Sequence, residues 1–314
     1  MRLYRPVVAA LALAISQAPW GRCAQVRLLS DLPLASVCGS DIAVDLAVPE
    51  ASPDARLPVL LFVHGGGWEE GGKEEMRGCM LGAAETGFFV GASVNYRLTS
   101  RPEPGDSAAD AVQVGAAWPL QRHDLECAIR WLRGAAAQLP ELRMNGRVGG
   151  VGHSAGGQLV QRLAVERGAG RLDAATSWAG PSDLYRLFQQ VPELRPTLAA
   201  LVGAPPREHR AAYQDASPAL LASPESAPIQ LIHGLDDRLV APSQSRLMHR
   251  ALIRAGAESE LLLVPGGHGF TPESFLTVWR ATLDFQGRKL HGAPGSRRPT
   301  SRGPSRAAPG AGGR

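Results

Sequence analysis

Residues 152–156 of this chain read Gly-His-Ser-Ala-Gly, which matches the pattern GxSxG. An apolar run at residues 148–151 precedes the pattern, and a stretch with helical spacing, residues 155–166, follows it. Between a strand and a helix, this pattern forms a tight turn that leaves the serine hydroxyl exposed. We therefore expect Ser154 to be a nucleophile that attacks a carbonyl carbon.

The same stretch also resembles a dinucleotide-binding motif, because Gly150, Gly152 and Ala155 fit GxGxxA between a strand and a helix. That motif needs an acidic residue at the end of the next strand, where it binds a ribose hydroxyl. Here Asp173 precedes the next expected strand, and none of the residues that end the strand is acidic. We expect no nucleotide and no other cofactor.

A serine hydroxyl is a weak nucleophile until a base accepts its proton. Of the eight histidines, His268 lies in a glycine-rich loop, residues 265–270, directly after the last expected strand. The flanking glycines allow its imidazole to reach across the end of the sheet, so His268 is the expected general base. His64 and His153 are better explained by packing and hydrogen bonding within their own motifs, and His233 by its place at the end of a strand.

The acid that orients this histidine should follow the strand ending at His233, where the sequence HGLDDRLV offers Asp236 and Asp237. A carboxylate in this position fixes the histidine tautomer and stabilises the imidazolium. The spacing HGxxDxxV favours Asp237 and leaves Asp236 as a loop or capping residue. Asp183 is a third candidate.

Residues 64–68, His-Gly-Gly-Gly-Trp, end an apolar run and match the HGGG motif of lipases and esterases. A tetrahedral intermediate carries negative charge on oxygen, and backbone N–H groups can stabilise it. We expect Gly66, Gly67 and Ala155 to supply those donors. The alternative is an ordinary glycine turn. The nucleophile motif at Ser154 further along the chain favours the oxyanion-donor interpretation over this alternative.

The substrate-binding surface is harder to read from the sequence. Trp68 is positioned to line the pocket, although a packing role is the alternative. The stretch at residues 183–223 is too short for a large lid, and residues 42–48 are strand-like where a helical cap would be needed. We therefore expect short acyl groups, with specificity arising on the alcohol side near Trp68.

Short apolar runs alternate with amphipathic stretches through the middle of the chain, which is typical of a mostly parallel sheet with helices on both faces. We expect an α/β-hydrolase fold with a small cover between residues 178 and 229 and no large cap. The expected strands are residues 57–64, 88–96, 148–151, 174–179, 229–233 and 261–265, and the expected helices are residues 124–139, 155–166, 243–255 and 275–285.

The length of 314 residues suits one catalytic domain, which we place at residues 25–287. Residues 1–24 resemble a signal peptide, because two arginines precede an apolar run at residues 7–15 that is too short to span a bilayer comfortably. We expect a periplasmic or secreted protein with no stable membrane insertion after cleavage. The cleavage site and the oligomeric state stay open.

Residues 288–314 form a basic tail rich in proline and glycine, which we expect to be disordered. The net charge of +4 is concentrated there, so the folded part is near neutral and we expect no nucleic-acid partner. The four cysteines show neither CxxC spacing nor a neighbouring histidine cluster, so we expect no metal site. One disulfide among Cys38, Cys79 and Cys127 and a set of free thiols are both compatible with the sequence.

Taken together, HGGGW, VNYRL, GHSAGG, HGLDDRLV and PGGHGF resemble the bacterial esterases of the BD-FAE group and, more broadly, the hormone-sensitive lipase family, over residues 57–285. This resemblance implies a serine carboxylesterase that cleaves carboxylic esters of small molecules through an acyl-enzyme, without a cofactor; the short acyl chain is the expectation drawn above from the small cover. Relatives that hydrolyse N-formylkynurenine make an arylformamidase the alternative. A noncatalytic binding protein on the same scaffold is a further alternative, although such a protein would normally have lost one of Ser154, His268 and Asp237.

Overall fold

The computed structural model describes residues 24–39, 42–50, 56–99 and 117–291. Apart from Ala24, the expected signal peptide lies outside the described residues, and so does the part of the expected tail beyond His291.

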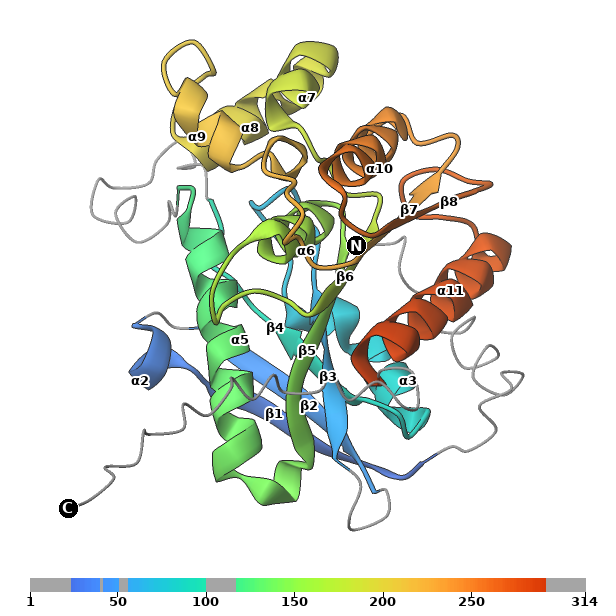
Figure 1. Ribbon diagram of the computed structural model, residues 1–314. Helices are drawn as coiled ribbons and strands as arrows, with labels where there is room; N and C mark the ends of the chain where they lie inside the picture. The colour runs from blue at the N-terminus through green and yellow to red at the C-terminus, as the bar shows by residue number, and fades with distance from the viewer. Residues whose placement is uncertain (1–23, 40–41, 51–55, 100–116, 292–314) are drawn as a thin grey trace, which may run out of the picture.

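One eight-stranded sheet forms the centre of the molecule (Figure 1). Its strands lie in the order β1-β2-β4-β3-β5-β6-β7-β8. The pairs β1–β2 and β2–β4 are antiparallel, and the other five neighbouring pairs are parallel. The expected mostly parallel sheet is therefore confirmed. The strands are β1 (Val26–Pro33), β2 (Ala43–Pro49), β3 (Leu57–Val63), β4 (Val90–Val94), β5 (Met144–His153), β6 (Ala174–Trp178), β7 (Ile229–Gly234) and β8 (Ser259–Val264).

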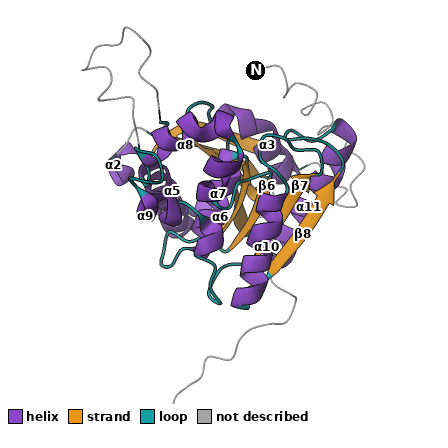
Figure 2. Cartoon of the chain, turned by 90° about the horizontal axis from the view of Figure 1, so that it is seen from above, coloured by secondary structure: helices purple, strands orange, loops and turns teal. Residues whose placement is uncertain are grey.

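Helices cover both faces of this sheet (Figures 1 and 2). On one face pack α5 (Leu120–Gln138), α6 (Ala155–Val165) and α10 (Ser243–Ala255). On the other pack α3 (Arg77–Glu85), preceded by the 3₁₀ turn η1 (Lys73–Met76), and α11 (Pro272–His291). The sheet is thus covered on both sides, as a parallel sheet requires.

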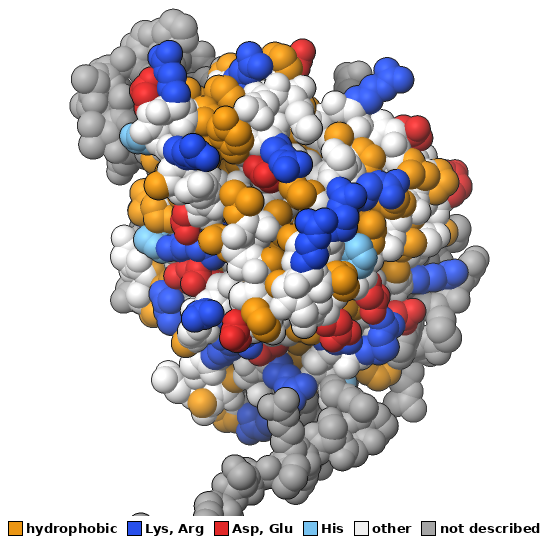
Figure 3. All heavy atoms as spheres, turned by 45° about the horizontal axis from the view of Figure 1, so that its top comes forward, with side chains coloured by type: hydrophobic (Ala, Val, Ile, Leu, Met, Phe, Trp, Pro, Cys, Tyr) orange, Lys and Arg blue, Asp and Glu red, His pale blue; other side chains and the backbone are white. Residues whose placement is uncertain are grey.

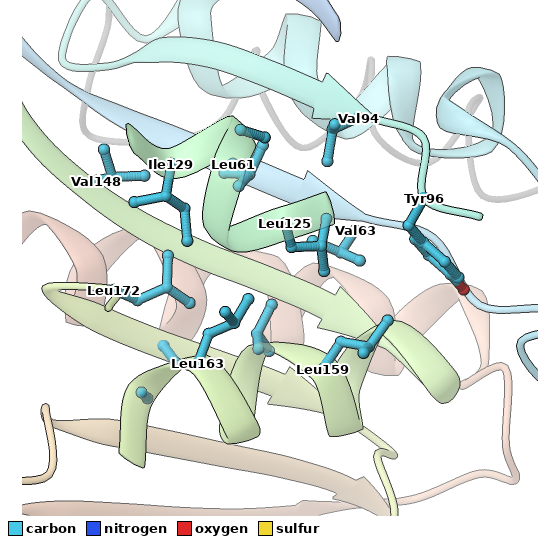
Figure 4. Packing of buried hydrophobic residues seen from close by; sticks show 14 of the residues in the cluster. Leu61, Val63, Val94, Tyr96, Leu125, Ile129, Val148, Leu159, Leu163 and Leu172 are labelled. Carbon is cyan, nitrogen blue, oxygen red and sulfur yellow. The ribbon is translucent and has the colours of Figure 1, made fainter. Parts of the chain in front are cut away.

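The helix α5 shows how the apolar spacing places an element. Leu125, Ile129 and Leu132 follow one another at intervals of three or four residues, and all three are fully buried. Figure 4 shows Leu125 beside Val63 of β3 and Ile129 beside Val148 of β5. Each such side chain contributes roughly 1.5–3 kcal/mol when it is fully buried. The helix begins at Leu120, four residues before the expected start.

The C-terminal helix is longer than its sequence pattern indicated. It was expected at residues 275–285, and α11 instead runs through His291, so residues 288–291 do not belong to the tail. Leu290 is fully buried in the core, and Arg288 pairs with Glu260 of β8 over 2.8 Å. Lys289 also pairs with Glu258. These contacts tie the last turn of α11 to the catalytic domain, although the sequence assigns residues 288–291 to the tail.

The segment between β6 and β7 forms the small cover. It contains α7 (Leu184–Gln190), α8 (Arg195–Val202) and α9 (Arg210–Asp215), with the short turns η3 (Pro192–Leu194) and η4 (Pro218–Leu220). These helices lie at the top of Figure 1, beyond the carboxyl ends of the parallel strands. Arg162 of α6, which is only 5% exposed, holds α9 through a 2.8 Å ion pair with Asp215. The cover is thereby attached to the helix that follows the GxSxG turn.

A disulfide joins Cys38, at the end of α2 (Ala35–Cys38), to Cys127 of α5. Cys79 is a buried free thiol, and Cys23 lies outside the described residues. The sequence allowed both a disulfide and free thiols, and the fold selects one specific pair. Within the described part of the chain, no helix combines the length and the apolar character needed to cross a bilayer.

Candidate active site

Ser154 lies in the sharp turn between β5 and α6. Its backbone has φ 55° and ψ −117°, an uncommon conformation for a residue with a side chain. A Cβ on Gly152 would lie 2.1 Å from the carbonyl oxygen of Gly156, and a Cβ on Gly156 would lie 2.2 Å from that of Val63. Only glycine fits at both positions, so the sequence GxSxG follows from the tightness of the turn.

His268 follows β8 and contacts the two other residues of the expected triad. Its Nε2 lies 2.8 Å from Ser154 Oγ, and its Nδ1 lies 2.7 Å from Asp237 Oδ2. A carboxylate only accepts hydrogen bonds, so Nδ1 carries the proton and Nε2 of the neutral ring is free to accept one from the serine. The sequence-predicted nucleophile, base and acid are therefore brought together in one chain of hydrogen bonds.

Asp237 is fixed by four hydrogen bonds. Oδ1 accepts from the backbone N–H groups of Leu239, at 3.0 Å, and Val240, at 2.9 Å. Oδ2 lies 3.1 Å from His233 Nε2 in addition to its contact with His268. Burial opposes ionisation of this carboxyl, but the hydrogen bonds from His233 and His268 outweigh it and hold the pKa of Asp237 well below its usual range.

The two alternative acids lie elsewhere. Asp236 is exposed to solvent, whereas its neighbour Asp237 is buried, with only 5% of its surface exposed. Asp183 caps the N-terminus of α7, where its Oδ1 accepts a 3.0 Å hydrogen bond from the backbone N–H of Arg186. Neither carboxylate has a hydrogen bond to His268 in the described structure.

His153, the residue before the nucleophile, supports the loop that carries the base. Its Nε2 lies 2.9 Å from the carbonyl oxygen of His268, to which it donates, and the two rings lie 5.0 Å apart. Burial lowers the pKa of His153 to about 4. His153 is therefore a neutral hydrogen-bond donor near pH 7, in keeping with its expected role inside the motif.

The glycine loop after β3 lies directly beside the serine. A Cβ on Gly65 would be 3.3 Å from the Cβ of Ser154, and a Cβ on Gly66 would be 2.0 Å from the carbonyl oxygen of Glu70. Gly66 and Gly67 have φ of 95° and 61°, which glycine adopts without strain. The loop therefore requires glycine both for its backbone conformation and for its closeness to the serine.

The three backbone N–H groups that the sequence predicts as oxyanion donors lie in this region. Within the ranges that the structure covers, those of Gly66, Gly67 and Ala155 make no hydrogen bond to another backbone group. Ala155 is also the first residue of α6, where the free N–H groups and the helix dipole favour negative charge.

His64 anchors the start of the same loop. Its ring stacks on Tyr96 with 4.3 Å between centroids, and the Tyr96 hydroxyl donates to the carbonyl oxygens of His64 and Gly65 at 3.2 and 3.1 Å. Burial lowers the pKa of His64 to about 4, so this ring is also neutral near pH 7. Both motif histidines thus support the backbone around the serine.

Trp68, for which the sequence allows a pocket-lining or a packing role, is buried beside the glycine loop. It is 4% exposed, and its indole Nε1–H donates over 3.1 Å to Oε1 of Gln158, a fully buried side chain of α6. The amide Nε2 of Gln158 in turn donates to the carbonyl oxygen of Ala216. The indole N–H thus finds a buried acceptor on α6, and Gln158 links it to the segment after α9; this arrangement favours the packing role for Trp68.

Two contacts of the site were missed in the sequence. The sequence identifies His233 only as the end of its strand, although His233 contacts Asp237; the four-residue spacing within HGxxD is the available signal. Thr197 of α8 donates to Glu69 over 3.2 Å, and its Cγ2 lies 3.4 Å from where a Cβ on Gly67 would be. No local pattern could reveal that contact, because 128 residues separate its partners.

Comparisons with known proteins identify the family of this chain. The family model BD-FAE matches residues 44–252. LipM of Mycobacterium tuberculosis, described as a probable carboxylic ester hydrolase, is 27% identical over 215 residues, which cover 63% of this chain and 45% of LipM. This chain thus spans about half the length of the curated relatives it matches.

Solved structures show the same fold. A truncated carbohydrate esterase from gut microbiota superposes with a TM-score of 0.68 at 24% identity, over 85% of this chain and 98% of that one. Esterase Est2 of Thermogutta terrifontis superposes with a TM-score of 0.63 at 22% identity, over 88% and 95% of the two chains. The α/β-hydrolase fold expected from the sequence is thereby confirmed.

Proposed function

Because this chain belongs to the BD-FAE family, we propose that it is a serine carboxylesterase that acts through an acyl-enzyme on Ser154. The observation that carries the proposal is the chain of hydrogen bonds from Ser154 Oγ through His268 to Asp237, at 2.8 and 2.7 Å. This arrangement lets one imidazole accept the serine proton while a buried carboxylate stabilises the positive charge that results.

In the first half of the reaction, Ser154 Oγ attacks the ester carbonyl carbon as its proton moves to Nε2 of His268. The carbonyl oxygen becomes an oxyanion, which the N–H groups of Gly66, Gly67 and Ala155 stabilise. Each such donor is worth about 3 kcal/mol in comparable sites. The tetrahedral intermediate then expels the alcohol, which takes the proton from His268, and the acyl group stays on Ser154.

In the second half, water replaces the alcohol. His268 accepts a proton from water, whose oxygen attacks the acyl carbon through a second oxyanion at the same donors. The bond to Ser154 Oγ breaks, the serine regains its proton from His268, and the carboxylic acid leaves. Asp237 stays ionised throughout, in agreement with the low pKa that its hydrogen bonds impose.

We propose short acyl groups as substrates. The cover helices have seven, eight and six residues, and α8 lies against the glycine loop through Thr197. On the face that carries the cover, hydrophobic side chains are interspersed with charged ones and form no continuous apolar patch in the view of Figure 3. A long acyl chain would find little surface to bury itself against, and each methylene left in water forfeits up to about 0.8 kcal/mol.

We also propose that the protein works in an oxidising compartment, either the periplasm or the medium. The signal-like pattern of residues 1–24 supports export. The disulfide between Cys38 and Cys127 supports it independently, because structural disulfides are rare where thiols are kept reduced.

A substrate panel tests the proposed activity. Wild-type protein and Ser154→Ala are compared on p-nitrophenyl acetate, acetylated and feruloylated sugars, and N-formylkynurenine. We expect the wild type to hydrolyse the esters with the largest kcat/KM and Ser154→Ala to be inactive on all of them. A larger kcat/KM on N-formylkynurenine would make the protein an arylformamidase, and binding without turnover would make it a noncatalytic member of the fold.

A further inference from the structure

His233 at the end of β7 approaches the catalytic carboxylate from the interior of the molecule. Its side chain is fully buried, whereas the side chain of His268 is 21% exposed. The two rings contact the same oxygen, Oδ2 of Asp237, at 3.1 and 2.7 Å. The catalytic acid therefore lies between two imidazoles, of which the proposed mechanism uses only one.

The neighbours of His233 fix its tautomer. Nε2 faces two groups that can only accept, Oδ2 of Asp237 and the carbonyl oxygen of Val240 at 2.7 Å. Nε2 must therefore carry a proton, which is shared between these two acceptors. Nδ1 lies 2.7 Å from Oγ of Ser245, a fully buried hydroxyl of α10 that can donate to it. Both ring nitrogens are thus held, so the ring cannot turn without breaking buried hydrogen bonds.

The carboxylate gains its orientation from this ring. Its Oδ1 is held by the N–H groups of Leu239 and Val240, which belong to the same loop as Asp237 and would move with it. At Oδ2, the hydrogen bond from His233 links the carboxylate to the buried end of β7. Without this donor, the carboxylate could turn about its side-chain bonds and weaken its contact with His268.

We propose that His233 is a positioning residue for the hydrolysis, whose Nε2–H holds Asp237 in the orientation that receives His268 Nδ1. This role rests on the proposed function, because it acts through the triad and touches no substrate. A histidine with only a structural role would need one acceptor for its Nε2–H, and the carbonyl oxygen of Val240 is the nearer of the two. The contact with Asp237 is the one that a purely structural role does not require. The ionisable groups facing this cluster are Asp237, His268 and His153.

Two substitutions separate the alternatives. His233→Gln keeps an N–H donor at about the place of Nε2, and His233→Phe keeps the ring shape without any donor. With p-nitrophenyl acetate we expect His233→Phe to lower kcat by up to about 100-fold at unchanged KM, because displacement of a catalytic group is costly. His233→Gln should recover most of that loss.

Gln230→Met is the matched control. Gln230 is another buried polar residue of β7, and its amide donates to the carbonyl oxygen of Ala281, away from the triad. This variant should lose stability but keep kcat. If His233→Phe lowered the melting temperature like Gln230→Met and kept the wild-type kcat, or if His233→Gln restored nothing, His233 would be structural only.

A spectrum of the wild type tests the proposal even where His233→Phe fails to fold. Long-range ¹H–¹⁵N correlation on histidine-labelled protein distinguishes protonated from unprotonated ring nitrogens. We expect His233 to show a protonated Nε2 and an unprotonated Nδ1, and a ring protonated on Nδ1 alone would overturn the proposal. An inactive wild type, by contrast, would refute the proposed function, since this tautomer is measured without turnover.

Discussion

Asp237 and His268 lie 31 residues apart in the sequence, yet Oδ2 of the first and Nδ1 of the second are separated by only 2.7 Å. The parallel pairing of β7 with β8 accounts for this closeness, because both residues lie in loops that leave the carboxyl ends of adjacent strands. The contact selects one of two consecutive aspartates, so it can be tested by changing each in turn.

Asp237→Asn should lower kcat by about 10⁴-fold, because an amide in this place can stabilise the wrong tautomer of the histidine. Asp236→Asn is the matched control, since its carboxylate is exposed and should affect kcat little. Steady-state kinetics on p-nitrophenyl acetate decide between them. If Asp236→Asn were the more damaged variant, the assignment of the acid would be wrong by one residue.

Stability should fall as the pH drops from about 6.5 to about 4, partly because of His64. Burial lowers the pKa of His64 to about 4, so in this window the unfolded chain binds a proton that the folded protein does not. The free energy of unfolding then decreases by up to about 1.4 kcal/mol per pH unit for this one group. His64→Phe, which keeps the stacked ring, should flatten the dependence.

Urea unfolding of both proteins at several pH values between 4 and 7 measures these slopes. Equal slopes for the wild type and His64→Phe would mean that His64 takes up its proton in the folded state at its ordinary pKa. Buried His153 contributes a slope of the same sign, so the dependence should weaken without vanishing.

The local motifs of the site could be predicted, and the contacts between distant segments could not. Ser154 and His268 follow from the glycine turns around them, and Asp237 follows from the spacing after β7. The burial of Trp68 depends on Gln158, which is 90 residues away in the sequence. The extension of α11 likewise depends on Glu260 of the neighbouring strand β8 and on Glu258, which directly precedes that strand.

The pairing of the cysteines illustrates the same limit. Cys38 and Cys127 are 89 residues apart, and only the packing of α2 against α5 brings their Cα atoms to 5.7 Å. No spacing rule distinguishes this pair from one that includes Cys79. Long-range packing decides such pairs, and a single sequence does not display it.

Loss of this disulfide should destabilise the fold. A crosslink that closes a loop of 89 residues restricts the unfolded chain and contributes about 2–5 kcal/mol. We expect Cys38→Ser combined with Cys127→Ser to lower the melting temperature, and dithiothreitol to lower that of the wild type but not that of the double variant. An oxidised wild type whose melting temperature did not respond to dithiothreitol would contradict this account.

Across p-nitrophenyl esters from acetate to palmitate, kcat/KM should be largest between two and four acyl carbons and should fall beyond that. The reason is the small cover, which leaves longer chains exposed to water. The measurement needs detergent-controlled solutions so that micelles do not limit the long substrates. A maximum at eight carbons or more would refute the proposed preference.

The central claim is that Ser154 is the nucleophile, and covalent labelling tests it most directly. The protein is treated with an organophosphonate, which forms a stable adduct with an activated serine, and the modified peptide is identified by mass spectrometry. We predict one label per chain, on Ser154, appearing in step with the loss of esterase activity and absent in Ser154→Ala. A label on any other serine, or full esterase activity in a chain labelled at Ser154, would contradict the account.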